Sequence, residues 1–207
     1  MWKRLLGDLL SPPCCAACDA RTTSLSAFCA ACVPTIERAD RGSEPLAVAL
    51  FGGAMAVAIR RLKYENRPDL ANPLGELLRA RCRDEQFAAD VVVPVPLHPR
   101  RLVERGYNQA ALLSHAVARE TGARFEPRVL VRIVDTPRQA ALGREERLRN
   151  IAQAFALRGP KRIAGRRVLL VDDVSTTGAT LAACRQALES ARPKSVRAIV
   201  LARTPTE

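Results

Sequence analysis

The chain has 207 residues, of which 48% are hydrophobic and 26% charged, a balance typical of one globular domain with a small appendage. Its 33 basic and 21 acidic residues give a formal net charge of +12, which favours anionic partners such as pyrophosphates or nucleic acid. Aromatic residues make up only 4% of the chain, which argues against a stacking platform for single strands and puts small phosphorylated ligands first.

The first dozen residues place Trp2 and four leucines on one face of a helix, which is expected to dock on the protein's own body. This apolar stretch is too short for a signal peptide. No apolar run in the sequence approaches the roughly 20 residues that span a membrane. We therefore expect a cytoplasmic protein that is not an integral membrane protein.

Five of the seven cysteines fall in the next segment, PPCCAACDARTTSLSAFCAAC. Two Cys-x-x-Cys pairs, separated by ten residues, can present four thiolates to one Zn²⁺ in a tetrahedron. The four candidate ligands are Cys15, Cys18, Cys29 and Cys32. Without a secretory signal, a disulfide framework is the weaker explanation. Four thiolates leave no open position, so this zinc would be structural. Cys14 is an alternative to Cys15, although its spacing is one residue longer than the usual knuckle.

The segment from Val33 to Pro45 is polar, has prolines near both ends and predicts a linker. It divides the chain into residues 1–45, with the N-terminal helix, the zinc-binding module and the linker, and residues 46–207, which form the main domain. Leu46 to Met55 is apolar, and a helix is expected to follow through Tyr64. The basic residues of this helix could face an anionic ligand or form a solvated helix face; they are Arg60, Arg61 and Lys63.

Asp90 to Leu97, DVVVPVPL, predicts a buried strand that its prolines end. Three arginines follow in the expected strand-to-helix turn, where Gly106 permits a tight backbone and Asn108 caps the next helix. These arginines are Arg100, Arg101 and Arg105. Arginine forks in such a turn suit a pyrophosphate, and the competing interpretation is a basic loop without special purpose.

Pro127 to Val134 predicts a third strand, and Thr136 to Leu157 is expected to be helical in its second half. The segment GPKRIAGRR precedes the central strand and should lie at the opposite end of the sheet from the ligand. Its four basic residues would meet nucleic acid there, or form a solvated turn. They are Lys161, Arg162, Arg166 and Arg167.

The most informative stretch is VLLVDDVSTTGAT, Val168 to Thr180. Its four apolar residues predict a strand buried on both faces, and Asp172 and Asp173 follow in an acidic turn. A hydroxyl-rich loop then enters a helix, for which Thr180 is a plausible cap. The loop consists of Val174, Ser175, Thr176, Thr177, Gly178, Ala179 and Thr180.

Each part of this stretch has a chemical use. The backbone N–H groups of a loop that enters a helix suit a phosphate. Paired carboxylates at a strand's carboxyl end can accept from vicinal sugar hydroxyls and help hold hydrated Mg²⁺. The combination is a ribose 5-phosphate pattern. A Walker-B strand is disfavoured because no G-x-x-x-x-G-K-[ST] motif occurs in the sequence. A receiver domain is disfavoured because too few residues follow the motif. The remaining alternative is that the two aspartates only cap the next helix.

After this motif, VRAIVLART supplies one more strand. Strand and helix patterns alternate from Asp90 onward, which predicts an α/β fold with a parallel sheet and right-handed crossovers.

The motif VLLVDDVSTTGAT resembles the phosphoribosyl pyrophosphate (PRPP) motif of type I phosphoribosyltransferases. Two further stretches, PVPLHPRRLVERGYNQA and RRLKYENRPDLANPLGELL, resemble signatures of the competence-associated ComF family. The resemblance covers nearly the whole chain. It implies a phosphoribosyltransferase-like parallel sheet flanked by helices, with an N-terminal four-cysteine zinc module.

The resemblance also implies roles for residues. Asp172 and Asp173 would be catalytic, and the loop from Val174 to Thr180 would bind PRPP with Mg²⁺. In type I phosphoribosyltransferases the region around Gln139 is a mobile loop that closes over PRPP; a solvated amphipathic helix is the competing interpretation. The pyrophosphate-binding set would be Arg100, Arg101, Arg105, Lys63 and Gln139.

Two functions follow from this resemblance. The first is that of a glycosyltransferase, which transfers a pentosyl (ribose 5-phosphate) unit to an acceptor that no segment specifies. The second is a non-enzymatic role in DNA uptake or processing, as a nucleotide-sensing or single-stranded DNA-binding scaffold or as a partner of DNA-uptake proteins.

Overall fold

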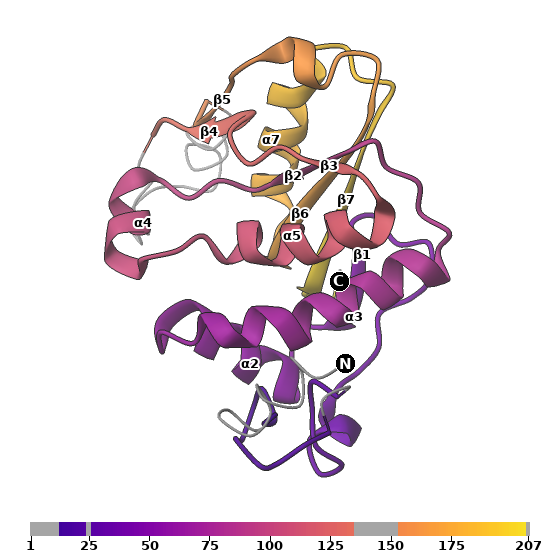
Figure 1. Cartoon of the computed structure of the whole chain (residues 1–207), viewed down its shortest axis with the longest axis vertical. Helices are drawn as coiled ribbons and strands as arrows, with labels where there is room; N and C mark the ends of the chain where they lie inside the picture. The colour runs from indigo at the N-terminus through magenta and orange to yellow at the C-terminus, as the bar shows by residue number, and fades with distance from the viewer. Residues whose placement is uncertain (1–12, 24–25, 135–152, 206–207) are drawn as a thin grey trace, which may run out of the picture.

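The computed structural model describes residues 13–23, 26–134 and 153–205. They form one five-stranded parallel sheet and the elements packed around it (Figure 1). The strand order is β1-β7-β6-β2-β3, and every neighbouring pair is parallel, as the alternating pattern predicts. The strands are β1 (Leu46–Leu50), β2 (Val91–Pro94), β3 (Arg124–Phe125), β6 (Arg167–Ser175) and β7 (Ser195–Arg203).

Strand β6 lies at the centre of this sheet because β7 pairs with it on one side and β2 on the other. Its residues Val168 to Val171 are buried, which confirms the prediction of a strand covered on both faces. Side chains alternate between the faces, so Leu169 packs in one hydrophobic cluster and Leu170 in the other. The central strand is therefore covered on both faces.

Three helices cover the first face of the sheet, and their apolar residues form one cluster with those of the strands. Asn108 caps α5, as predicted, because its side chain accepts from the backbone N–H of Ala110 at 3.0 Å. Gly122, with φ of 65°, ends the same helix in the left-handed region. The helices are α2 (Gly53–Tyr64), α3 (Ala71–Asp84) and α5 (Gln109–Thr121).

The second face carries α7 (Ala179–Glu189) and a small antiparallel sheet of β4 (Leu130–Arg132) and β5 (Phe155–Leu157). The strand predicted in residues 127–134 is therefore present as β4, but it lies outside the parallel sheet. The parallel partner of β2 is β3, which is only two residues long. Leu130 instead faces α7, where pairing with β5 buries both Leu130 and Phe155. Most of the predicted helix in residues 136–157 lies outside the described residues.

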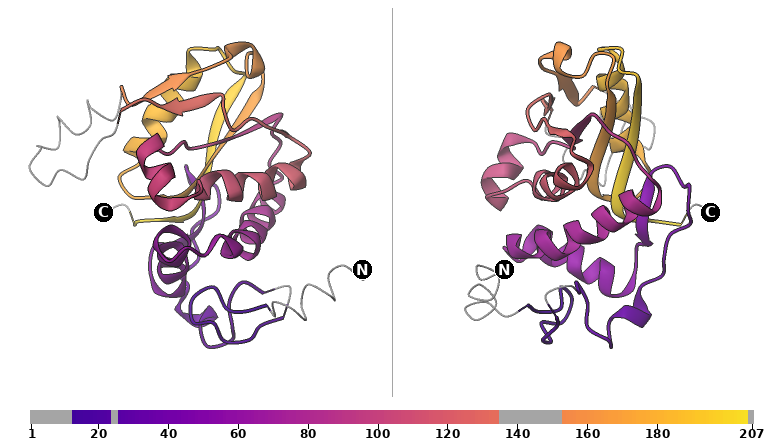
Figure 2. Two further views of the ribbon diagram at one scale, coloured as in Figure 1. Left: turned by 60° about the vertical axis from the view of Figure 1, so that its left-hand side comes forward. Right: turned by 45° about the vertical axis from the view of Figure 1, so that its right-hand side comes forward.

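The cysteine segment packs beneath α2, at the end of the molecule opposite the short 3-10 helix η3 (Pro160–Arg162) (Figure 2). Cys15 and Phe28 are buried in the same cluster as Leu62 of α2. Two further 3-10 helices occur, η1 (Val33–Thr35) and η2 (Pro68–Leu70). After η1 the predicted linker runs along β1, where the N–H of Leu50 donates to the carbonyl of Glu37 at 2.8 Å. The linker therefore also covers the sheet edge.

Among the described residues, no helix combines the length and apolar character needed to cross a membrane.

Candidate functional site

Asp172 and Asp173 lie within β6 and not in a turn beyond it, which corrects the sequence interpretation. The reason is that β7 continues to pair with β6 as far as Ser175. Both carboxylates are consequently enclosed by neighbouring strands, with 8% of Asp172 and 2% of Asp173 exposed. They stand at the carboxyl end of the central parallel strand, where open α/β sheets bind ligands.

The carboxylate of Asp173 is only half satisfied. Its Oδ1 lies 2.8 Å from Nζ of Lys63, in the last turn of α2. Its Oδ2 is buried without a hydrogen-bond partner among the described residues. A buried acceptor without a donor costs free energy, which a ligand hydroxyl can recover by donating to it.

Asp172 has a different electrostatic environment. Its Oδ1 accepts the backbone N–H of Asp173 at 2.9 Å. Burial raises the pKa of Asp172, the neighbouring charge of Asp173 raises it further, and Lys63 opposes both effects; the pKa is about 8. Asp172 therefore keeps its proton near neutral pH until cationic groups approach it.

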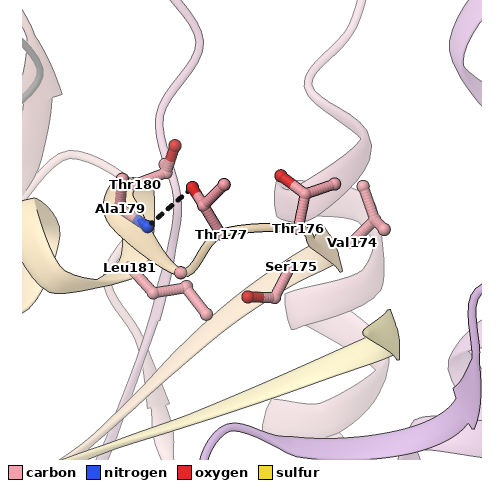
Figure 3. Close-up of a pocket in the computed structure, with 8 residues that line it drawn as sticks. Val174, Ser175, Thr176, Thr177, Ala179, Thr180 and Leu181 are labelled. Carbon is pink, nitrogen blue, oxygen red and sulfur yellow. Dashed lines mark hydrogen bonds between the residues drawn. The ribbon is translucent and has the colours of Figure 1, made fainter. Parts of the chain in front are cut away.

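The hydroxyl-rich loop lines a small cavity of about 30 Å³ directly after the carboxylates (Figure 3). In Figure 3 the hydroxyls of Thr176, Thr177 and Thr180 lie on one side of the loop, and Ser175 points the other way. Gly178 has φ of 75°, which favours glycine, so its backbone can turn directly into α7. The loop therefore presents hydroxyl donors close to the start of a helix.

Helix α7 begins at Ala179, so Thr180 is not its cap, contrary to the prediction. The side chain that serves this end is Thr177, whose Oγ1 accepts from the N–H of Ala179 at 3.4 Å. N–H groups in the first turn of a helix have no intrahelical acceptors and carry a partial positive charge. This end of α7 can therefore receive a phosphate.

The three predicted arginines lie on a short helix, α4 (Pro99–Arg105), and not in an open turn. The turn interpretation fails because His98 caps this helix: its Nδ1 accepts the N–H of Arg100 at 3.4 Å. Arg101 and Arg105 line a pocket of about 450 Å³ together with Lys63. Arg100 points outward and pairs with Glu104 at 3.1 Å, so the structure does not bring it to the pocket.

Two contacts join this pocket to α2. The guanidinium of Arg105 lies over the ring of Tyr64, 5.4 Å from its centroid. The hydroxyl of Tyr107 donates to the backbone carbonyl of Leu62 at 2.6 Å. The arginine helix and the last turn of α2 are thus fixed to each other. Gln139, the remaining member of the predicted pyrophosphate set, lies outside the described residues.

Cys15, Cys18, Cys29 and Cys32 form a compact cluster whose sulfur atoms all lie within 4.8 Å of one another. Sγ of Cys18 lies 3.6 Å from that of Cys29 and 3.7 Å from that of Cys32, and all seven cysteines are free thiols. A tetrahedral site with metal–sulfur bonds of about 2.3 Å has sulfur–sulfur edges of about 3.8 Å. The cluster therefore fits a metal ion.

Two observations refine this metal site. Burial opposes ionisation of Cys15, but backbone N–H donors, that of Cys29 foremost, outweigh it and lower the Cys15 pKa to about 6. A thiolate at neutral pH is the form that binds metal. Cys14 is outside the cluster, and its sulfur accepts from Nη2 of Arg67 at 3.5 Å. The four-cysteine cluster thus includes Cys15 and not Cys14.

The basic segment before β6 lies at the far end of the sheet from the carboxylates, as predicted. Two of its arginines already have acidic partners within the fold. Arg162 pairs with Glu126 at 2.7 Å, and Arg167 pairs with Asp90 at 2.7 Å. Lys161 and Arg166 are exposed. Only part of the expected basic surface is therefore open to an anionic partner.

The structure corrects the expectation that Arg61 faces the ligand. Its guanidinium makes three hydrogen bonds, to Ala16 and Asp19 of the cysteine segment and to Glu65 at the end of α2. It stands two residues before Lys63, and residues two apart on a helix point in nearly opposite directions. This spacing separates the two side chains but does not reveal that Arg61 faces the cysteine segment.

Comparison with known proteins gives consistent similarities. Residues 112–207 match the phosphoribosyl transferase domain. The chain is 33% identical over 162 residues to the DNA utilization protein YhgH of Escherichia coli O6:H1, which covers 76% of this chain and 70% of that protein. It is 29% identical over 180 residues to Competence protein F of Haemophilus influenzae, and this match covers 84% of this chain and 77% of that protein. It is 32% identical over 164 residues to Competence protein ComFC of Streptococcus pneumoniae, covering 76% and 67%.

Among solved structures, the chain is similar to the allosteric regulatory enzyme of purine biosynthesis, with 19% identity and a TM-score of 0.48. The values are the same for glutamine phosphoribosylpyrophosphate amidotransferase from B. subtilis. In both cases the match covers 69% of this chain and 30% of the other. The chain thus spans less than a third of the length of these two enzymes.

Proposed function

The chain belongs to the ComF family of proteins with a phosphoribosyl transferase domain, and from this premise we propose that it binds PRPP together with Mg²⁺. The observation that carries the proposal is the buried carboxylate pair directly before the hydroxyl loop, in which Oδ2 of Asp173 has no hydrogen-bond partner in the part of the chain that the structure describes. Vicinal ribose hydroxyls are donors of the right kind for these two side chains.

The 5-phosphate of the ligand would occupy the loop from Val174 to Thr180. The cavity there is small, which suits a single phosphate group. Threonine hydroxyls and the first N–H groups of α7 supply donors, and the helix end favours negative charge. Because the loop follows the carboxylates directly, a ribose whose hydroxyls reach Asp173 would have its 5-phosphate on the side of the loop.

The pyrophosphate would occupy the larger pocket beside Lys63, Arg101 and Arg105. Arginine forks match phosphate oxygens in geometry and charge. Arg100 and Gln139 complete the proposed set; Arg100 would have to leave Glu104 to take part. When bound, Mg²⁺ would neutralise part of the pyrophosphate charge, and the acidic pair offers the oxygen ligands that this ion prefers.

The proposed reaction is pentosyl transfer. The bond between ribose C1 and the pyrophosphate oxygen breaks, the acceptor's nucleophilic atom bonds to C1, and pyrophosphate leaves with the bonding electron pair. Positive charge develops on the ribose during this exchange, and the carboxylate of Asp173 stabilises it at short range. Asp172 releases its proton when the cationic groups of the loaded site lower its pKa. The basic residues of the pocket hold the leaving group.

We also propose that the cysteine cluster holds zinc, since four thiolates are the ligand set of structural zinc sites. With no position left for substrate, this metal stabilises the fold around it. The division of the chain into residues 1–45 and 46–207 remains part of this proposal.

A second candidate function is a non-enzymatic role in DNA uptake or processing. Two observations favour it: the names of the competence and DNA-utilization relatives, and the net charge of +12. In that case the PRPP site would sense a nucleotide-like ligand, and exposed basic residues would hold single-stranded DNA or a DNA-uptake protein.

Titration calorimetry with PRPP and Mg²⁺ tests the first proposal. We expect binding by the wild type and at least tenfold weaker binding by Asp173→Asn, which alters the partnerless oxygen, while Asp84→Asn on the exposed end of α3 binds normally. Equal affinities in the three proteins, or no heat at all, refute the proposed site. Pyrophosphate release across a panel of bases and amines then separates the functions. Pyrophosphate release by the wild type that is lost in Asp173→Asn supports the enzyme. No pyrophosphate release with any acceptor, together with salt-sensitive DNA binding, supports the scaffold.

A further inference from the structure

Arg61 connects α2 to the cysteine segment through the two terminal nitrogens of its guanidinium group, while its Nε bonds to Glu65 at the end of the same helix. Its Nη1 donates to the carbonyl of Ala16 at 3.1 Å, and its Nη2 donates to Oδ2 of Asp19 at 2.5 Å. These two acceptors lie within and directly after the first Cys-x-x-Cys pair. Only 7% of Arg61 is exposed, although it carries a full charge. Its place therefore depends on that turn of the cysteine segment being ordered.

Three consecutive residues of α2 tie three parts of the molecule together. Arg61 holds the cysteine segment, Leu62 accepts from Tyr107 beyond the arginine helix, and Lys63 pairs with Asp173 of β6. A helix rises about 1.5 Å per residue, so these attachments fall within about 3 Å along its axis. A shift at one of them is therefore transmitted to the others.

A second arginine strengthens the connection below α2. Arg67 donates to Oδ1 of Asp19 at 3.0 Å, while Arg61 holds the other oxygen of the same carboxylate. Arg67 also bonds to Asp69 at 2.8 Å, in η2. Asp19 immediately follows the metal-ligand candidate Cys18 and is thus held by two arginines of the main domain.

We infer that Arg61 is a positioning residue that couples metal occupancy of the cysteine cluster to ligand affinity at Asp173. The inference rests on the proposed PRPP site and deepens it. A bound metal fixes the turn from Cys15 to Cys18, and with it the acceptors that hold Arg61. Without the metal these acceptors lose their fixed places, the last turn of α2 loosens, and Lys63 and the pocket beside it lose their alignment. Coupling of this kind is reciprocal, so the ligand must also strengthen metal retention.

The test compares Arg61→Met with Arg60→Met in the full chain. Both substitutions remove an arginine from the same turn of α2, but Arg60 is exposed. Each protein is measured with its metal and after treatment with a chelator selective for zinc over Mg²⁺. The readouts are metal content, hydrogen exchange of the α2 amides and calorimetric affinity for PRPP with Mg²⁺. Asp19→Asn, at a half-exposed side chain, is the milder second variant.

We expect metal removal to weaken PRPP binding about tenfold in the wild type and in Arg60→Met and to speed exchange in the last turn of α2. In Arg61→Met, binding should already be weak with metal present, and removal should add less than twofold, because the coupling residue is absent. Asp19→Asn should lie between these cases. The same chelator effect in Arg61→Met as in Arg60→Met overturns the inference.

The exchange measurement separates this inference from the proposed function. If the wild type binds no PRPP, the proposed function fails, and metal-dependent exchange in α2 that requires Arg61 still supports the structural coupling. If PRPP binds but neither its affinity nor α2 exchange responds to metal, the coupling fails and the proposed function stands.

Discussion

Nζ of Lys63 lies 2.8 Å from Oδ1 of Asp173, and this ion pair joins the last turn of α2 to the central strand. The side chains of Lys63 and Asp173 are 16% and 2% exposed. Removing one member of a buried pair leaves the other charge uncompensated, whereas removing both can be close to neutral.

Lys63→Met should therefore destabilise the fold by about 3 kcal/mol, and Asp173→Asn in the same chain should restore most of that loss. Urea unfolding of the single and double variants measures both effects, with Lys194→Met, an exposed lysine, as the control. If the double variant is as unstable as the single one, the lysine matters for packing and not for the charge of Asp173.

Asp172→Asn should stabilise the protein, and more so as the pH rises. The pKa of Asp172 is raised from 3.8 to about 8 in the fold. Its contribution is thus fully present below pH 3.8 and is lost as the pH rises through about 8. Asparagine keeps the acceptor for the Asp173 N–H without this loss.

Since one pKa unit corresponds to about 1.4 kcal/mol, we expect the variant to gain at least about 2 kcal/mol over the wild type at pH 9. The gain should shrink toward pH 4. Thermal unfolding from pH 4 to 9 measures it, and parallel stability curves for the two proteins would contradict the raised pKa. If the more stable variant binds PRPP more weakly, Asp172 lowers the stability of the fold while it contributes to ligand binding.

Cys18→Ser should reduce the metal content from about one ion per chain to nearly none, because serine is a poor ligand for a soft thiolate site. Elemental analysis of purified protein under reducing conditions measures this. Cys14→Ser is the matched control: its sulfur lies outside the cluster, so the metal should remain. Metal loss from both variants to the same extent would argue against the assigned ligands.

The basic segment at the far end of the sheet gives a test of nucleic-acid binding. Arg167 is held by Asp90 and is a poor candidate for phosphate contact, so Lys161→Gln with Arg166→Gln is the informative pair. If DNA binds here, the double variant should bind it more weakly, and the salt slope should fall by about 0.7 for each lost contact to a single strand. PRPP affinity should not change. An unchanged slope assigns these residues to a solvated turn.

Local patterns were sufficient to predict much of this molecule. The apolar run before Asp172, the cap at Asn108 and the paired cysteine spacing each depend on neighbouring residues, and the structure confirms the strand, the cap and the cluster. The failures depend on distant partners. Asp172 belongs to the strand because β7 pairs with β6 beyond it. Leu130 lies outside the main sheet because its strand pairs with β5.

The site shows the same division. The sequence named Lys63, Arg101 and Asp173 as candidates, and the fold brings Lys63 to both of the others. Nothing in the sequence indicated that Arg100 turns to Glu104 or that Arg61 faces the cysteine turn, because side-chain direction on a helix depends on what packs against it. Candidate residues on a helix were thus predictable as a group but not individually.

The sheet order has a consequence for the order in which the molecule can be completed during synthesis. Among the described strands, β7 is the one sheet neighbour of β1, although it comes much later in the sequence, and β2 reaches β1 through β6 and β7. Because the ribosome delivers the N-terminal part first, β1 cannot join the sheet until β6 and β7 have been synthesised. The cysteine segment, whose ligands lie within 18 residues, needs no such delay. We expect it to acquire its metal on the nascent chain and to offer α2 a surface on which to settle before the sheet can close.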